Sequence, residues 1–248
     1  MHEPYIRVVS DAVGTVVMIH GILGTPRHFD RFLPYVPDNW SIYNMLLDGH
    51  GGSPKDFSRT SMQKWRAQIF TLLNKISQTH SRIVITGHSM GTLLAMEAAV
   101  RYPQVVGLFL LNVPLCLHIK PIMVYRLTKL CFHKSNAADP WEHALKQAAG
   151  IQCTAKLWKY VGFIPRFWEL LQLCKHCRSI MPNLRLPCRI FFSQKDELVS
   201  LRSAALFQRF SDLEPVILPD SGHYYYSPQE LSVLTNALRE FLEKEISQ

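Results

Sequence analysis

The sequence predicts an α/β fold in which a mostly parallel central sheet is flanked by helices and interrupted by a helical insertion. Apolar runs bounded by turn residues alternate with helical patterns along most of the 248 residues, as expected for a parallel sheet covered on both faces. A chain of this length can bury one sizeable core as a single domain. One interval, residues 114–185, contains helical patterns and no clear strand.

Six apolar runs rich in β-branched and aromatic residues are the strand candidates. They cover residues 15–20, 41–47, 82–86, 106–112, 188–193 and 215–218. Helical patterns occupy residues 27–35, 61–79, 90–101, 201–210 and 228–244. We therefore expect a core built from residues 1–113 and 186–248. Residues 114–185 are expected to form a cap over the carboxyl ends of the strands, where open α/β sheets bind ligands.

The junction between the third strand candidate and the next helix carries the pentapeptide Gly87-His88-Ser89-Met90-Gly91. A sharp strand-to-helix turn crowds the backbone, so small residues are expected at both glycine positions. The serine hydroxyl would stand clear of the sheet, in front of the free N–H groups of the helix N-terminus. This is the G-x-S-x-G pattern of a nucleophile elbow in its required context.

A serine hydroxyl needs a base to take its proton and an acid to orient that base. His223 follows the last strand candidate on a Ser-Gly loop, a suitable place for the base. Asp196 comes where the strand at 188–193 ends, from which a carboxylate can reach the next loop. Glu197 and Asp220 are rival acids. Asp196 is favoured because its segment, D-E-L-V-S, closes the strand and opens the following helix.

Acyl transfer also needs N–H donors for a developing oxyanion. The serine turn supplies one donor, from Met90. The second is expected from the loop after the first strand candidate, where Gly21 lets the backbone approach a substrate; Ile22 is the predicted donor and Leu23 the alternative. We expect the nearby histidines to be structural, with the one beside the serine turned away from the pocket: His20, His28, His50 and His88.

Five segments in this order resemble the α/β-hydrolase superfamily, particularly its small bacterial carboxylesterases and monoacylglycerol lipases. They are His20-Gly21-Ile22-Leu23-Gly24, Asp48-Gly49-His50-Gly51-Gly52-Ser53, Gly87-His88-Ser89-Met90-Gly91, Asp196-Glu197-Leu198-Val199 and Ser221-Gly222-His223. The cap has no motif that matches. The resemblance implies an α/β-hydrolase fold without a cofactor. It implies these roles: nucleophile Ser89, general acid/base His223, orienting acid Asp196, and oxyanion donors Ile22 and Met90.

The basic charge of the chain is concentrated in the predicted cap. Residues 113–185 contain eleven Lys and Arg against three Asp and Glu, whereas the rest of the chain carries sixteen of each. Cationic helices with aromatic residues suit the surface of an anionic membrane. The alternatives are an acidic substrate or a basic face that is merely solvated. Nucleic acid is not an expected partner, because no nucleic-acid motif accompanies the charge.

The amino-terminal segment has neither the basic start nor the apolar stretch of a signal peptide, and no apolar run has the length of a membrane span. We therefore expect a cytoplasmic location and free thiols at the six cysteines. Cys174-Lys175-His176-Cys177 resembles half a zinc site, but no second pair follows at a suitable spacing. No metal is predicted.

The leading hypothesis is hydrolysis of a carboxylic ester with an apolar acyl chain, such as a monoacylglycerol, through an acyl-enzyme on Ser89. The same residues would serve an acyltransferase, because water and an alcohol or amine compete for one intermediate. A non-catalytic binding protein on this fold has little need for nucleophile, base, acid and oxyanion loop together. The sequence leaves the acyl length, the alcohol and the oligomeric state open.

Overall fold

The computed structural model describes residues 2–210 and 213–245, whose strands form one seven-stranded sheet. The order across the sheet is β1-β3-β2-β4-β5-β6-β7. β1 pairs antiparallel with β3, and the other neighbouring pairs are parallel. The strands are β1 (Tyr5–Arg7), β2 (Gly14–Ile19), β3 (Trp40–Met45), β4 (Ile83–His88), β5 (Val105–Leu111), β6 (Cys188–Ser193) and β7 (Val216–Leu218).

The predicted, mostly parallel sheet is confirmed, and its six predicted strands are present with small shifts at their ends. β1 has no counterpart in the prediction. Tyr5 and Ile6 of this edge strand are 41% and 57% exposed, so the segment lacks the buried apolar run that marks the other strands. Its place follows from pairing with β3, where Ile6 lies opposite Tyr43.

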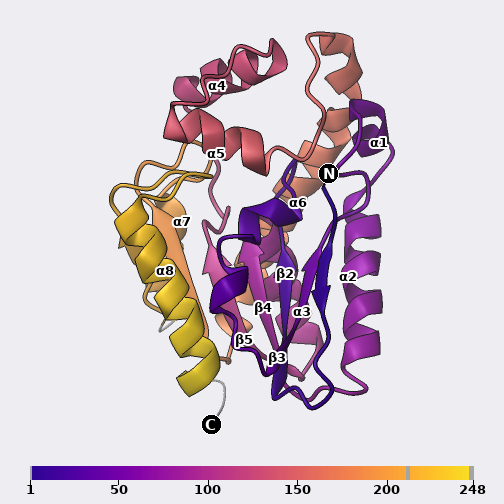
Figure 1. The fold of residues 1–248 in the computed structure, drawn as a ribbon, viewed down its shortest axis with the longest axis vertical. Coiled ribbons are helices and arrows are strands. Elements are labelled where there is room, and N and C mark those ends of the chain that lie inside the picture. The colour runs from indigo at the N-terminus through magenta and orange to yellow at the C-terminus, as the bar shows by residue number, and fades with distance from the viewer. Residues whose placement is uncertain (1, 211–212, 246–248) are drawn as a thin grey trace.

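Alternate side chains of the central strands enter two cores, one on each face of the sheet. Val16 and Met18 of β2 belong to one core, and Val17 and Ile19 to the other, as a period of two requires. Four helices cover these faces: α2 (Met62–Ile76), α3 (Met90–Arg101), α7 (Arg202–Phe210) and α8 (Pro228–Glu240). The first three pack on the face of Val17 and α8 packs on the other. Figure 1 shows α2 and α8 on opposite sides of the sheet.

The predicted helix at 27–35 is wrong. The segment forms two 3₁₀ turns, η1 (Pro26–Phe29) and η2 (Leu33–Tyr35). Pro34 has no N–H with which to continue an α-helix, and its ring would clash with the carbonyl four residues earlier. The aromatic residue Phe32 between the turns is fully buried in the α8-side core. The apolar spacing of the segment therefore reflects burial without an α-helix.

Two of the correctly predicted helices begin after a capping serine. α2 starts after Ser61, whose hydroxyl accepts the N–H of Lys64. α8 starts after Ser227 and is followed at its end by a π-helical turn, Phe241–Glu245. A further helix, α1 (Pro54–Ser58), is too short to show a periodic pattern and begins with a capping box.

Between β5 and β6 the chain forms helical elements: α4 (Pro121–Cys131), α5 (Pro140–Ala148), η3 (Leu157–Phe163), α6 (Ile164–Ile180) and η4 (Met181–Asn183). Figure 1 shows α4 and α5 together beyond one end of the sheet. α6 returns to the core, where Leu173, Cys174 and Cys177 join the cluster formed by α2 and α3. Within the described ranges, no helix has the length and apolar character that crossing a membrane requires.

Gly150, which follows α5, joins the insertion to two loops of the core. Its N–H donates to the carbonyl of Leu23, and its own carbonyl accepts the N–H of Gly51, each at 2.6 Å. A Cβ at Gly150 would stand 1.9 Å from the carbonyl oxygen of Gly24. Glycine is therefore required for the insertion to meet the core at this point.

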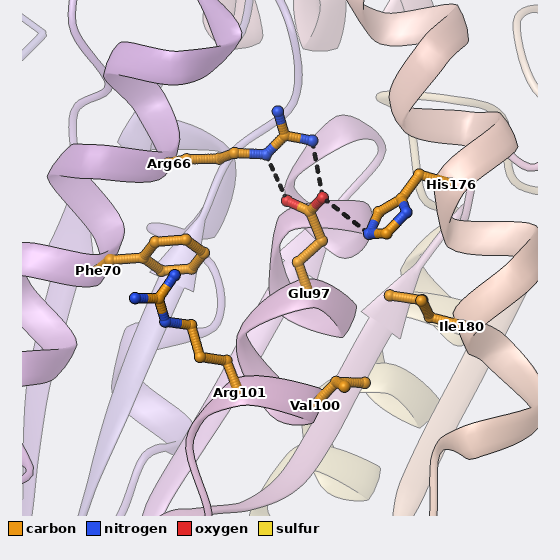
Figure 2. Close-up of a pocket in the computed structure, with 7 residues that line it drawn as sticks. All are labelled: Arg66, Phe70, Glu97, Val100, Arg101, His176 and Ile180. Atoms are coloured by element: carbon orange, nitrogen blue, oxygen red, sulfur yellow. Dashed lines mark hydrogen bonds and ion pairs between the residues drawn. The ribbon is translucent and has the colours of Figure 1, made fainter.

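A cluster of charged side chains ties α6 to α2 and α3 (Figure 2). Arg66 of α2 forms two 2.7 Å hydrogen bonds with the carboxylate of Glu97 on α3. His176 of α6 reaches the same carboxylate at 3.4 Å. Beside them the guanidinium of Arg101 lies 4.8 Å from the centre of the Phe70 ring, and these side chains line a cavity of about 280 Å³. One half-buried carboxylate thus lies at the meeting point of three helices.

We expect Gly91→Ala to destabilise the fold, although alanine is the better helix former. A Cβ at this position would stand 1.9 Å from the carbonyl oxygen of Ile19, a backbone atom of β2 that no rotamer change can move. Overpacking of this kind costs about 1–3 kcal/mol or more. Urea unfolding measures the change in the free energy of unfolding. Ala99→Gly in the same helix is the control for helix propensity, and it should destabilise the protein by about 1 kcal/mol. A Gly91→Ala protein as stable as the wild type would contradict the close packing.

Candidate active site

Ser89 stands between the last residue of β4 and the first residue of α3, with φ 51° and ψ −125°. A positive φ strains a non-glycine residue and persists only where the surroundings hold it. Ser89 donates its N–H to the carbonyl of Leu111 at 2.9 Å, and its carbonyl accepts from the N–H and the hydroxyl of Thr92. A Cβ on Gly87 would lie 2.7 Å from the backbone nitrogen of Thr92. The turn is crowded, as its glycines predict.

His223 and Asp196 lie against each other beyond the ends of β7 and β6, and both are 2% exposed. Nδ1 of His223 is 2.8 Å from Oδ2 of Asp196. The other carboxylate oxygen accepts the N–H groups of Leu198 and Val199, each at 2.7 Å. Because a carboxylate only accepts, the shared proton resides on Nδ1 and leaves Nε2 of His223 as a proton acceptor.

The two rival acids lie in different surroundings. Asp220 is on the surface, where its carboxylate pairs with Lys195 at 2.7 Å. Glu197 is buried, but its carboxylate accepts the backbone N–H of His223 at 3.0 Å. Of the three candidate acids, Asp196 is the one whose carboxylate meets the His223 ring.

The loop that carries His223 is attached to the serine turn through His88. Nε2 of His88 lies 2.9 Å from the carbonyl oxygen of His223, and the two ring centroids are 4.8 Å apart. His88 immediately precedes Ser89, so one strand end anchors both loops. The described residues show no hydrogen bond between the Ser89 hydroxyl and the His223 ring. In ligand-free sites such bonds are often long and tighten when substrate is bound.

The loop after β2 passes directly beside Ser89. A Cβ on Gly21 would stand 2.9 Å from the Cβ of Ser89, so glycine permits this approach. Leu23 of the same loop has φ 58°, and its N–H donates to Nε2 of His50 at 3.2 Å. The N–H of Leu23 is therefore already engaged within the protein.

The two predicted oxyanion donors differ from Leu23 in this respect. The N–H of Ile22 has no acceptor among the residues that the structure describes. Met90 is the first residue of α3, a position whose N–H has no acceptor within the helix. Neither N–H group is therefore engaged by an acceptor in the described part of the chain.

Four buried histidines pack around these loops. Burial lowers the pKa of His20, His28 and His88 well below the usual value, and it lowers the pKa of His50 to about 4. The rings of His28 and His88 stack with centroids 3.8 Å apart, and Nε2 of His20 accepts the N–H of Leu47 at 3.1 Å. These neutral rings support the loops on either side of Ser89.

The insertion contributes side chains to this region that no sequence motif indicates. Arg126 of α4 forms an ion pair with Glu197. Trp141 of α5 lies against Tyr225, with ring centroids 4.6 Å apart. These residues come from the part of the chain without a recognisable pattern, and only the folded chain brings them beside the His223 loop.

The sheet, its flanking helices and the serine turn define an α/β hydrolase. A metagenome-derived lipolytic enzyme has the same fold with a TM-score of 0.75 and 20% identity, over 98% of both chains. The monoacylglycerol lipase of Paleococcus ferrophilus follows with a TM-score of 0.70 and 14% identity, over 97% of this chain and 98% of that one. The fold predicted from the sequence is confirmed.

The chain belongs to the serine aminopeptidase S33 family, whose sequence profile matches residues 10–225. A thermostable monoacylglycerol lipase from Bacillus sp. (strain H-257) is 31% identical over 98 residues, 39% of each protein. A pimeloyl-[acyl-carrier protein] methyl ester esterase from Aromatoleum aromaticum is 26% identical over 131 residues, 52% of this chain and 44% of that protein. The matched part of the chain thus spans less than half the length of these curated relatives.

The buried histidines predict how stability depends on pH. The unfolded chain binds a proton at His50 below its ordinary pKa near 6.5, whereas the folded protein does so only near pH 4. The contribution of neutral His50 to the free energy of unfolding is therefore complete above pH 6.5. It is lost as the pH falls from 6.5 toward 4, at about 1.4 kcal/mol per pH unit. We expect the free energy of unfolding to fall between pH 7 and pH 5, with His20, His28 and His88 adding to the loss.

Urea unfolding of His50→Gln across this range tests the prediction. Glutamine keeps an acceptor for the Leu23 N–H and cannot take up a proton, so the loss between pH 6.5 and 5 should shrink by about 2 kcal/mol. His143→Gln, at an exposed position, is the matched control and should leave the pH slope unchanged. Equal slopes for wild type and His50→Gln would contradict the assignment.

Proposed function

We propose that the protein hydrolyses carboxylic esters with an apolar acyl chain, through an acyl-enzyme on Ser89. The observation that carries the proposal is the buried pair of Asp196 and His223, tied by His88 to the strained turn of Ser89. Membership of a serine hydrolase family and the ester-cleaving names of its relatives support the same chemistry. No cofactor is needed for it.

In the proposed reaction, Ser89 Oγ attacks the ester carbonyl while Nε2 of His223 takes the hydroxyl proton. The N–H groups of Ile22 and Met90 receive the oxyanion, and Asp196 holds the imidazolium. Collapse of the tetrahedral intermediate breaks the ester bond, and the alcohol leaves with the proton from His223. Water then attacks the acyl-enzyme by the same proton transfers, releasing the carboxylic acid and the free serine.

Hydrolysis is favoured over acyl transfer because the names of the matched relatives are those of ester hydrolases. The acyl chain is proposed to be apolar because monoacylglycerol lipases are among the matched relatives and because the aromatic pair Trp141–Tyr225 lies where the insertion meets the His223 loop.

We expect Ser89→Ala to lower ester turnover by several orders of magnitude, because the oxyanion donors and substrate binding alone leave only residual catalysis. Turnover of 4-nitrophenyl butyrate and of a monoacylglycerol measures the loss. A fluorophosphonate probe should label the wild type and spare the variant. Turnover by Ser89→Ala close to that of the wild type would end the proposal.

The acid is tested separately with matched amide substitutions. Asp196→Asn should abolish most of the activity, because asparagine cannot hold the tautomer that leaves Nε2 free. Asp220→Asn is the control at a solvent-exposed carboxylate and should retain activity close to that of the wild type. A crippling effect of Asp220→Asn would transfer the orienting role to that residue while leaving the serine mechanism intact.

We further propose that the insertion rests on an anionic lipid surface. An apolar face on η3 and α6 consists of large side chains that are 63–72% exposed: Leu157, Trp158, Val161, Ile164 and Trp168. Five large exposed apolar side chains at helical spacing within twelve residues are typical of a surface that meets a partner or a membrane. Lys156 and Lys159 stand within the same stretch and are exposed. In the cytoplasm, the predicted location, the anionic inner leaflet matches both properties.

Co-sedimentation with vesicles of phosphatidylglycerol and phosphatidylcholine tests this contact. The wild type should pellet at low salt and less at high salt. Lys156→Glu/Lys159→Glu should weaken binding strongly, whereas Lys75→Glu/Lys244→Glu, which makes the same charge change away from the face, should not. Arg166 is left unchanged because it pairs with Glu169. A wild-type protein that stays in the supernatant at low salt, or that self-associates through this face, would refute lipid contact.

A further inference from the structure

Glu197, the neighbour of Asp196, connects the insertion to the backbone of His223. One carboxylate oxygen accepts the N–H of His223 at 3.0 Å, and the other forms an ion pair with Arg126 of α4. The two side chains of this pair are 4% and 14% exposed. A buried carboxylate is stable only when it is paired and hydrogen-bonded, and this one meets both conditions through two separate parts of the chain.

The guanidinium of Arg126 is held in place by the next helix of the insertion. It lies 4.8 Å from the centre of the Trp141 ring on α5. Trp141 in turn lies against Tyr225. A Cβ on Gly222 would stand 2.2 Å from the Trp141 ring. The indole therefore occupies the space that glycine leaves beside His223, and it fixes Arg126 above Glu197.

The backbone of the insertion also binds the loop after β6, which carries Asp196 and Glu197. The N–H of Lys120 donates to the carbonyl of Glu197, and the N–H of His118 donates to the carbonyl of Leu198, each at 2.9 Å. Leu117 forms a β-bridge with Val199. The segment that positions Asp196 is therefore bound along its length by residues that precede α4.

We propose that Glu197 and Arg126 act as a positioning pair, which holds the His223 backbone and balances the charge beside its ring. This inference rests on the proposed role of His223 as the general base. Arg126 offsets the negative charge of Glu197, so Asp196 is left as the one uncompensated carboxylate facing the imidazole. Neither residue touches the reacting atoms.

Three other titratable side chains beside His223, those of His88, His28 and Tyr224, are neutral and do not take over this balance. Nε2 of His118, in the segment before α4, lies 3.2 Å from the carbonyl oxygen of Asp196, and the guanidinium of Arg31 lies 5.5 Å from the centre of the Tyr226 ring. Burial lowers the pKa of His88, against the ring of His223, and of His28 behind it. Burial raises the pKa of Tyr224, whose ring lies edge-on to His223. When the Arg126 charge is removed, the hydrogen bond from the His223 N–H still stabilises the ionised form of Glu197. Two carboxylates, Asp196 and Glu197, then lie beside one imidazole and favour its protonated form.

The experiment compares variants by the pH at which kcat/KM for 4-nitrophenyl butyrate reaches half its plateau. Arg126→Met removes the charge and keeps most of the apolar stem. Arg126→Met/Glu197→Gln removes both charges and keeps an acceptor for the His223 N–H. Lys129→Met breaks the ion pair with Glu142 on the same helix without touching the His223 loop, and it controls for a loosened insertion.

We expect Arg126→Met to raise this midpoint by about one pH unit, as one uncovered charge a few ångströms away would do. The double variant should return to the wild-type midpoint, and Lys129→Met should keep it. An unchanged midpoint in Arg126→Met, or an equal shift in Lys129→Met, would overturn the proposal.

A second measurement separates failure of this proposal from failure of the proposed function. The NMR titration of the His223 ring, assigned with His223→Gln, follows the same charge effect without any turnover. If the wild type hydrolyses no ester, the proposed function fails. The charge balance would still be supported if the midpoint of the His223 titration rises in Arg126→Met and returns to the wild-type value in the double variant. A titration that does not move would refute it.

Discussion

Helix α3 begins so close to the backbone of β2 that no side chain fits between them at Gly91. This contact fixes the geometry of everything built around Ser89. The chain must leave β4 in a tight turn to reach the helix, and the turn forces Ser89 to a positive φ. The loop after β2, which shares the contact, is brought beside the serine at Gly21. The free N–H groups near Ser89 are thus a product of how one helix packs on one strand.

Burial of polar groups sets a second constraint on the molecule. Asp196 and Glu197 are adjacent in the chain and nearly inaccessible to solvent, yet each carboxylate is satisfied by a different set of partners. Asp196 meets backbone N–H groups and the ring of His223, whereas Glu197 meets the His223 backbone and Arg126. Because a buried carboxylate without partners is costly, the two acidic side chains hold the surrounding loops in one arrangement.

The sequence carries enough information to predict the elements that depend on local pattern. The β-branched run before Gly87 and the helix formers after Gly91 predict β4 and α3, because burial on both faces requires an apolar strand. β1 escapes prediction because its side chains are exposed and its pairing with β3 is a long-range property. The prediction of a helix at residues 27–35 fails because apolar residues at helical spacing are buried there without an α-helix, which Pro34 prevents.

The candidate site likewise contains residues that the sequence predicts and residues that it does not. The positions of Ser89, Asp196 and His223 follow from strand ends and from the resemblance, and the structure brings Asp196 and His223 into contact. That the N–H of Leu23 is engaged depends on His50, which lies far along the chain. Arg126 and Trp141 could not be predicted, because the contacts of Arg126 with Glu197 and of Trp141 with Tyr225 arise only when the insertion folds over the sheet.

The hydrogen bonds at Gly150 have a consequence for how such a chain can change. These bonds attach the end of the segment that contains α4 and α5, residues 117–150, to the core loops at Leu23 and Gly51. The bridge between Leu117 and Val199 attaches its beginning. The segment with α4 and α5 is therefore attached to the core through its backbone at both ends, and between these ends through the contacts of Arg126 with Glu197 and of Trp141 with Tyr225. A replacement of different length would have to keep both backbone anchors, and it would still remove the side chains of Arg126 and Trp141 that contact Glu197 and Tyr225.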